Sequence, residues 1–455
     1  MKYLSTRNND LDESFLDILF QGLSKDGGLF LPKKWPRINI QELKNKEYHE
    51  LASSIIYPYL ENEISKEQLD LITKNTYINF NHKKVAPLVN ISENKYILEL
   101  FYGPTFAFKD YALQFLGNLF SEMLKNKKRK ITIIGATSGD TGSAAINAFK
   151  GKDEIDVFIL HPHEKVSDVQ RLQMTSVNEK NIHNIAIKGT FDDCQKIVKD
   201  LFMDNDLQSK TSLTAVNSIN WARLIAQTVY YFWTYVQLNE NKINFIVPSG
   251  NFGNIFSARI AKYMGLPIEQ LHIVTNSNDI LNRTMTSGIM KIDKVTQTYS
   301  PSMDIQVSSN FERQLFESNN RNATNIRKIM MNFVNNGYYE LEEDILNNLK
   351  SIYLSHSVSN QETLKTIKLF NDNFNYLADP HTATGLNILN KLNNNTPVIS
   401  LACAHPAKFG DAIKEATGNY PKMPKELENL FDKEEKVVIL ENDINIIKNF
   451  ILKYL

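Results

Sequence analysis

The chain has 455 residues, 42% of them hydrophobic and 22% charged, which is the composition of an ordinary soluble globular protein. Lysine plus arginine and aspartate plus glutamate both number 51, so the net charge is zero, and neither nucleic acid nor a membrane surface is expected as a partner. Two widely separated cysteines, Cys194 and Cys403, argue against a disulfide framework and favour a cytoplasmic location. The N-terminus shows no secretory signal, and no apolar run reaches membrane-spanning length.

The first part of the chain predicts several short elements. In chain order we expect a helix over residues 15–22, an extended piece over 29–32, an amphipathic helical stretch over 41–75 and a strand over 96–100. A longer helix follows Asp110, where apolar residues recur at helical spacing. The basic run at residues 125–130 ends this helix and is expected to be a solvated face.

From residue 131 onwards, predicted strands alternate with predicted helices. Runs of β-branched and apolar residues predict strands over 131–135, 156–160, 184–188, 243–247, 272–275 and 398–402. Helical spacing predicts helices over 191–202 and 221–238. This alternation indicates parallel strand pairing with right-handed crossovers, and therefore an α/β fold. Residues 310–373 are expected to be helical and uninterrupted by a strand.

One lysine, Lys109, lies among aromatic residues where a Gly-Pro turn leads into the helix after Asp110. Burial of its ammonium group would lower the pKa and make the neutral amine accessible. A neutral amine can form a Schiff base with a carbonyl cofactor such as pyridoxal phosphate. The alternative is that Lys109 extends from the first helical turn to solvent.

Two glycine-rich loops, residues 138–143 and 249–254, each follow a predicted strand and precede a predicted helix. Backbone N–H groups at such a position can bind phosphate or carboxylate, and glycines allow the anion to come close. Neither loop has the spacing of a Walker A or dinucleotide-binding motif. Each glycine could instead close a tight turn. The two loops taken with Lys109 favour a cofactor phosphate and an anionic substrate.

Five motifs stand out along the chain: Gly-Pro-Thr-Phe-Ala-Phe-Lys-Asp at 103–110, Ala-Thr-Ser-Gly-Asp-Thr-Gly at 136–142, Asn-Ser-Ile-Asn at 217–220 with Arg223, Pro-Ser-Gly-Asn-Phe-Gly at 248–253, and His-Pro-Ala-Lys-Phe at 405–409. Together they resemble the threonine synthase family. The resemblance continues through the Ser-Thr-Arg of residues 5–7, residues 26–32, 303–304 and 309–313, and the Asp-Pro-His of residues 379–381, and covers nearly the whole chain in order. The resemblance implies a fold-type II pyridoxal-phosphate enzyme with two lobes, parallel sheets flanked by helices, and the cofactor between the lobes.

The resemblance also implies a role for each matching residue. Lys109 would be the Schiff-base lysine and the proton shuttle. The cofactor phosphate would bind the backbone of Gly250, Asn251, Phe252, Gly253 and Asn254. The loop made by Thr137, Ser138, Gly139, Asp140 and Thr141 would bind the substrate carboxylate and help to hold the substrate phosphate. The substrate phosphate would contact Asn217, Ser218 and Arg223, because a guanidinium binds phosphate through two hydrogen bonds.

Two positions depart from the family pattern. Cys403 stands where better-known members have a threonine that bonds the pyridine nitrogen, and a thiol is a weaker donor than a hydroxyl. We expect Cys403 to face the cofactor ring, although a core position next to a late strand is the alternative. Asp140 stands where shorter fold-type II relatives have asparagine, which makes it a candidate substrate-loop residue and not a ring contact.

The resemblance implies conversion of O-phospho-L-homoserine and water to L-threonine and phosphate, the last step of threonine biosynthesis. The alternatives are a phospho-lyase that releases 2-oxobutyrate, a serine or threonine dehydratase, and a catalytically idle cofactor-binding protein. No metal is expected, since His161 and His163 fit no metal-ligand spacing. We expect a monomer or homodimer with an N-terminal segment over 1–100, a smaller domain over 101–240 and a large cofactor-binding domain over 241–455, with a helical insertion near 310–375.

Overall fold

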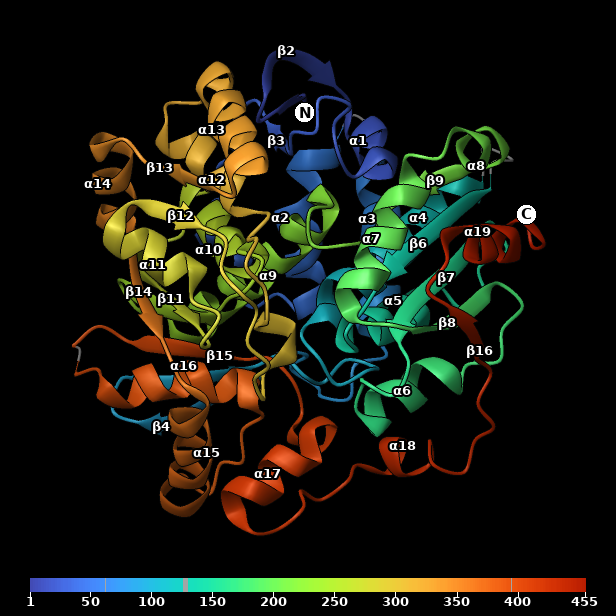
Figure 1. Cartoon of the computed structure of the whole chain (residues 1–455). Helices are drawn as coiled ribbons and strands as arrows, with labels where there is room; N and C mark the ends of the chain where they lie inside the picture. Colours follow the sequence, from blue (N-terminus) through green and yellow to red (C-terminus); the bar gives the residue numbers. More distant parts are fainter. Residues whose placement is uncertain (62, 126–129, 394) are drawn as a thin grey trace. The chain divides into compact units, whose positions relative to one another are not determined.

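The computed structural model describes residues 1–61, 63–125, 130–393 and 395–455 (Figure 1). Backbone contacts divide the chain into two compact units. The first unit comprises Met1–Tyr102 and Ser218–Pro421, and the second comprises Gly103–Asn217 and Lys422–Leu455. This grouping places residues 1–100 and the expected helix over 221–238 with the large unit, and residues 422–455 with the small one. Residues 126–129 of the basic run lie outside the described residues.

The first unit is built on a six-stranded sheet whose strand order is β14-β11-β10-β15-β5-β4. All its pairs are parallel except β4 with β5, which pair antiparallel at one edge. The central strands are apolar and buried, as expected where helices cover a parallel sheet. The strands are β4 Leu88–Ser92, β5 Lys95–Glu99, β10 Ile243–Pro248, β11 Ile268–Thr275, β14 Tyr353–Ser357 and β15 Val398–Ala402.

Several helices of the first unit begin at a residue whose side chain caps the helix. Asn220, for example, accepts a hydrogen bond from the backbone N–H of Ala222 and starts α9. These helices are α1 Phe15–Gln21, α2 Tyr48–Leu60, α3 Lys66–Tyr77, α9 Trp221–Leu238, α10 Gly253–Tyr263, α11 Ile280–Ser287, α12 Phe311–Ser318, α13 Ala323–Asn336, α14 Glu343–Ile352, α15 Asn360–Phe374, α16 Pro380–Lys391 and α17 Gly410–Thr417, with short 3₁₀ turns η1 Ile40–Leu43, η2 Pro301–Met303 and η3 Pro406–Phe409.

Two small antiparallel sheets complete the first unit. One has the order β2-β1-β3, and the other pairs β12 with β13. Their strands are β1 Tyr3–Ser5, β2 Asn8–Glu13, β3 Phe30–Pro32, β12 Ile289–Lys291 and β13 Tyr338–Glu340. The expectation that no strand interrupts residues 310–373 is wrong, because β13 and β14 both lie there. β14 pairs with β11 at the edge of the main sheet, and its polar sequence Tyr-Leu-Ser-His-Ser hides this role.

The second unit has a five-stranded parallel sheet in the order β16-β8-β7-β6-β9. In Figure 1 the C-terminal strand β16 lies beside β8, with which it pairs. Parallel sheets in both units confirm the predicted α/β class. The elements are α4 Lys109–Lys125, β6 Ile131–Ala136, α5 Asp140–Phe149, β7 Ile155–Pro162, α6 Asp168–Thr175, β8 Ile182–Lys188, α7 Phe191–Phe202, α8 Asn205–Lys210, β9 Ser212–Thr214, α18 Lys425–Glu428, β16 Val438–Glu441 and α19 Ile444–Leu452.

Candidate active site

The turn before Lys109 is held by the residue that follows it. Asp110 is fully buried, and its carboxylate accepts hydrogen bonds from the backbone N–H of Thr105 at 2.8 Å and from the Thr105 hydroxyl at 2.7 Å. A side chain at Gly103 would clash with Asp110, because an added Cβ would lie 2.4 Å from that residue's Cβ. Phe106 adopts a left-handed backbone conformation with φ of 60°. The turn is therefore tightly specified, and it places Lys109 at the first position of α4.

Lys109 is buried beside a carboxylate of the same unit. Lys109 is 8% exposed, and its Nζ lies 3.6 Å from Oδ2 of the buried Asp140. Gln170 donates to the other carboxylate oxygen, Oδ1, at 2.8 Å. A carboxylate at this distance favours the ammonium form of an amine, whereas burial favours the neutral form. The extension of Lys109 to solvent is wrong, and the sequence prediction omitted the electrostatic influence of Asp140.

The loop after β6 is folded around its own threonine. The Thr137 hydroxyl oxygen accepts from the backbone N–H of Gly139 at 3.0 Å and of Gly142 at 2.8 Å. Gly139 has φ of 139°, and an added Cβ would lie 2.4 Å from the Gln170 side chain. The loop thus brings Asp140 to the start of α5. Ser138 and Thr141 are half-buried in the same loop.

The loop after β10 lies at the carboxyl edge of the larger sheet. It enters α10 through Phe252, which has a left-handed φ of 61°. Ser308 donates to the carbonyl of Gly250 at 2.7 Å, and Asn310 donates to the carbonyl of Asn251 at 3.1 Å. With its carbonyls bound from outside, the loop has its N–H groups available. Within the described part of the chain, none of the backbone N–H groups of residues 250–254 donates to another protein group.

Asn254 adds a second feature that suits a phosphate. Its Oδ1 accepts hydrogen bonds from the hydroxyls of Tyr230 and Tyr231, the latter at 2.8 Å. Its Nδ2 is buried, and no hydrogen-bond partner for it is found among the described residues. A buried donor without a partner is costly unless a bound group satisfies it. Free backbone amides at a helix start and this orphaned amide donor fit the phosphate of pyridoxal phosphate.

The predicted substrate-phosphate residues lie at the start of α9. Asn217 is the last residue of the segment in the second unit, and Ser218 begins the next segment of the first unit. Asn310 donates to the Ser218 carbonyl at 3.1 Å, and Arg313 donates to the carbonyl of Ile219 at 2.7 Å. Arg223 is 3% exposed, and burial lowers its pKa to about 10, so it remains a cation at neutral pH.

The same helix α12 ties this loop to the N-terminal segment. Arg7 binds Glu312 through two hydrogen bonds of 2.9 and 2.8 Å, and the Thr6 hydroxyl donates to Glu312 at 2.6 Å. Residues 5–7 therefore contact residues 309–313. This contact gives both motifs a supporting role beside the motifs that form the candidate site. Neither motif carries a chemical signal on its own, so residue chemistry alone could not assign this supporting role.

Cys403 follows β15, the strand next to β10 in the sheet. It is 6% exposed, and its backbone N–H donates to the Thr382 hydroxyl at 2.8 Å. Asp379, which is fully buried, accepts from the Thr382 hydroxyl and, at 2.8 Å, bonds the His381 ring. Parallel pairing therefore brings Cys403 and the 250–254 loop to one edge of the sheet, where ligands bind in α/β folds. Its contact with a cofactor ring stays a prediction.

The candidate residues thus form one group in each unit. The second unit joins Lys109 with Asp140 and the 137–141 loop, and the first unit joins the 250–254 loop with Cys403 and holds the Ser218 and Arg223 segment. Sequence reasoning missed Gln170, which no local motif marks, and it gave no role to Asn310, although this residue lies within the 309–313 motif; both residues orient these groups. The described residues contain no group of three metal-ligating side chains. Among them, no helix has the length and apolarity that a transmembrane segment needs.

Three family models match the chain: Threonine synthase N terminus over residues 2–77, Pyridoxal-phosphate dependent enzyme over 85–329, and Threonine synthase, C-terminal, over 382–451. The threonine synthase of Pseudomonas aeruginosa is 42% identical over 462 residues, covering 100% of this chain and 98% of that protein. The threonine synthase of Saccharomyces cerevisiae is 41% identical over 498 residues, covering 99% and 97%.

Solved structures agree with the sequence comparison. Pyridoxal-phosphate-bound threonine synthase from Brucella melitensis superposes with a TM-score of 0.97 at 43% identity, covering 100% of this chain and 99% of that one. Threonine synthase from Escherichia coli superposes with a TM-score of 0.85 at 29% identity, covering 100% of both chains. The chain belongs to the threonine synthase family of pyridoxal-phosphate-dependent enzymes.

Proposed function

We propose that the protein converts O-phospho-L-homoserine and water to L-threonine and phosphate, as the last step of threonine biosynthesis. Its family membership supports the reaction, and the buried Lys109 beside Asp140 is the observation that carries the chemistry. Burial of an amine next to a carboxylate provides one group that can exchange protons repeatedly without exposure to bulk water.

Three groups of residues would hold the cofactor, each at a different part of the molecule. Lys109 would bond its aldehyde carbon, the backbone of Gly250, Asn251, Phe252, Gly253 and Asn254 would bind its phosphate, and Cys403 would face its ring nitrogen. When bound, pyridoxal phosphate supplies an electron sink for the substrate's α-carbon. The unbonded N–H groups of the loop and the buried Nδ2 of Asn254 support the phosphate assignment.

The substrate would be held at both ends. The loop made by Thr137, Ser138, Gly139, Asp140 and Thr141 would bind its carboxylate. Asn217, Ser218 and Arg223 would bind its phosphate, which leaves from Cγ and carries growing negative charge as the bond breaks. A guanidinium that is 3% exposed stabilises such charge more strongly than one in water.

Lys109 would move the protons. Its neutral amine would take the proton from Cα and pass it to the substrate phosphate, which leaves with it; the freed amine would then take the proton from Cβ and deliver it to Cγ. Water would add its hydroxyl group at Cβ, and its remaining proton would go to Cα through the same amine. Asp140 stabilises the ammonium form between these transfers, and Gln170 fixes the orientation of Asp140. Exclusion of other water from the amine keeps these proton transfers with the substrate.

The test is product analysis. Purified protein loaded with pyridoxal phosphate is incubated with O-phospho-L-homoserine, and both amino acids and phosphate are quantified. We expect threonine and phosphate in equal amounts. Phosphate with 2-oxobutyrate in place of threonine would assign the phospho-lyase reaction instead. Turnover of serine or threonine, but not of the phosphorylated substrate, would assign a dehydratase. No phosphate release would contradict the proposal.

We also propose a cytoplasmic location and a monomeric or homodimeric state. Both cysteines are buried thiols, which is typical of proteins in reducing compartments. Fractionation of the source cells would test the location, and light scattering of the purified protein would test the assembly. A secreted form or a larger oligomer would contradict these two proposals.

A further inference from the structure

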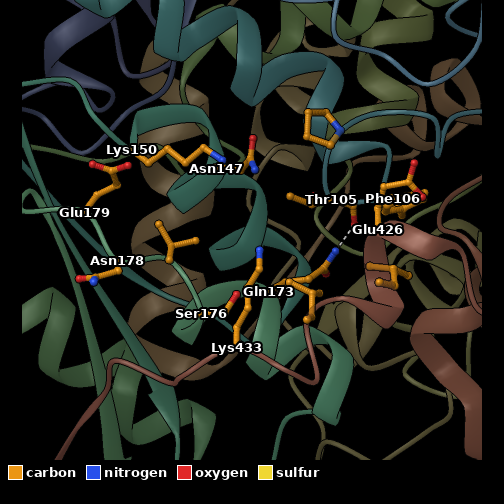
Figure 2. A pocket seen from close by; sticks show the side chains of 14 residues that line it. Thr105, Phe106, Asn147, Lys150, Gln173, Ser176, Asn178, Glu179, Glu426 and Lys433 are labelled. Carbon is orange, nitrogen blue, oxygen red and sulfur yellow. Dashed lines mark hydrogen bonds between the residues drawn. The ribbon is translucent and has the colours of Figure 1, made fainter.

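The second unit contains a pocket that the proposed reaction does not use (Figure 2). Its volume is about 300 Å³, which lies at the lower end of small-molecule sites. The turn at Thr105 and Phe106 forms one wall, the end of α5 at Lys150 forms another, and the segment after α18 closes it at Lys433. All of these residues belong to the second unit.

The floor of the pocket presents a buried acceptor. Gln173 is 8% exposed, and its Nε2 donates to the Thr105 carbonyl at 3.0 Å, which fixes the orientation of the amide. Its Oε1 is buried, and no described residue donates a hydrogen bond to it. A buried acceptor without a hydrogen bond is unfavourable unless a donor reaches it. A ligand with an N–H or ammonium group would remove that cost.

The rim carries charges of both signs. Figure 2 shows the side chain of Lys150 extending from the side of Glu179 toward Asn147, and the side chain of Lys433 ending near Gln173. Glu179 and Glu426 also line the pocket. Desolvation by burial lowers the pKa of Lys150, Glu179 opposes that shift, and Lys433 adds to it by repulsion. An anion between the two lysines would relieve their repulsion, and an ammonium group would suit the carboxylates.

The wall after α18 is fixed in place. Glu435 accepts from the Thr175 hydroxyl at 2.6 Å and forms an ion pair with Arg171. The backbone N–H of Lys436 donates to the Thr175 carbonyl at 2.6 Å. Leu427 and Leu430 are buried and line the pocket. The pocket is therefore a built feature of the second unit.

The pocket is connected to the turn that positions Lys109. Gln173 bonds the carbonyl of Thr105, and the N–H and hydroxyl of Thr105 bond Asp110, the neighbour of Lys109. A ligand that contacts Gln173 therefore acts on a residue that is two hydrogen bonds away from Asp110, which directly follows Lys109 in the chain. Lys150, Lys433 and Glu179 make no contribution to the candidate active site.

We propose that this pocket binds a free α-amino acid, with its ammonium group at Gln173 and its carboxylate between Lys150 and Lys433, and that occupancy changes turnover through the Thr105 turn. The zwitterion matches the mixed charges of the rim better than a simple anion does. The effect on turnover rests on the proposed function, whereas binding can be tested without it.

The experiment is calorimetric titration of the full chain loaded with pyridoxal phosphate. The probes are glycine, L-alanine, L-serine, L-aspartate, L-lysine, L-methionine and L-isoleucine, with acetate and methylammonium as half-ligands. We expect at least one amino acid to bind, and the double variant Lys150→Ala with Lys433→Ala to bind it at least about tenfold more weakly. The matched control is Lys180→Ala with Lys196→Ala, two exposed lysines of the same unit outside the pocket, which should bind like the parent.

Turnover of O-phospho-L-homoserine is then measured with and without the bound probe. We expect a change of about fivefold or more in the parent and in the control variant, and none in the pocket variant. No binding, equal binding by the pocket variant, or binding without a change in turnover would overturn the proposal. If the parent shows no turnover without a probe, the proposed function fails separately, and the absorbance of the cofactor bound at Lys109 becomes the readout for the turn.

Discussion

The two glycine-rich loops have the same position in their sheets but opposite hydrogen bonding. In the loop after β6, Thr137 binds two of the loop's own N–H groups, and the group that faces Lys109 is the buried carboxylate of Asp140. In the loop after β10, Ser308 and Asn310 bind the carbonyls instead, and the five N–H groups of residues 250–254 bind no described protein group. One loop therefore acts through a side chain and the other through its backbone.

This difference shows why a glycine-rich loop alone is a weak functional signal. Glycine at residue 139 meets a local need, since it allows φ of 139° and contact with Gln170. Glycine at residue 250 instead avoids the neighbouring backbone at Met303, whose Cα an added Cβ would approach to 3.2 Å. The partners of the loop, and not its composition, decide whether it can bind an anion.

The largest effect is expected from replacing Lys109, whose amine lies beside Asp140 of the loop after β6. Lys109→Ala should lower turnover by at least about 10³-fold, because no other group then moves the protons. The unfolding midpoint should stay within a few degrees of the parent, since alanine suits a helix start. Steady-state kinetics and thermal unfolding test this. Near-normal turnover would exclude Lys109 as the proton-transfer group.

A change in the loop after β10, which would bind the cofactor phosphate through its backbone, should lower the affinity for the cofactor. In Gly250→Ala the new methyl group pushes the loop away from residues 302–303, so its N–H groups lose their common direction. We expect pyridoxal phosphate to bind about tenfold more weakly, which corresponds to about 1.4 kcal/mol. Fluorescence titration of the cofactor measures this. Unchanged affinity would mean that the phosphate binds elsewhere.

A third change, in the loop after β6, tests the stability of the fold separately from cofactor binding. Thr137→Val keeps the shape of the side chain but removes the acceptor for the N–H groups of Gly139 and Gly142. The free energy of unfolding should fall by about 2 kcal/mol, with cofactor affinity preserved. Thr137→Ser is the matched control, because it keeps the hydroxyl. Equal loss in both variants would show that the methyl group, and not the acceptor, stabilises the loop.

The smallest effect is expected at Cys403. Replacement by serine exchanges a weak donor for a stronger one of similar size. If the side chain faces the cofactor ring, the absorbance of the bound cofactor should shift and turnover should change by a few-fold at most. Absorbance spectra of the two loaded proteins provide the measurement. Identical spectra would place Cys403 in the core next to β15.

The sequence predicts the regular parts of the fold well, for physical reasons. The helix over 221–238 and the strand over 398–402 are found with those bounds, because each has a long, unbroken apolar pattern and a clear cap or turn at its ends. β14 was missed because it is a polar edge strand, and the role of residues 422–455 was missed because long-range pairing leaves no local pattern.

The candidate site also has a part that the sequence predicts and a part that it does not. Lys109 and the two loops stand out because turn chemistry and glycine spacing are local signals. The supporting contacts of Gln170 with Asp140, of Asn310 with Asn251 and of Glu312 with Arg7 join residues far apart in the chain, and an amide or carboxylate within a helix carries no signal of its partner. The ammonium–carboxylate distance could not be predicted for the same reason.

The pairing of β16 with β8 has a consequence for protein synthesis. Roughly half of the chain is synthesised between β8 and β16. At about 5–20 residues per second, the edge of β8 therefore stays without its partner strand for about 10–50 s. During that interval the nascent chain exposes an unpaired, largely apolar strand edge, which is a site of aggregation. Chaperones that bind nascent chains should therefore matter more for the second unit than for the first, and slow translation should lower the soluble yield.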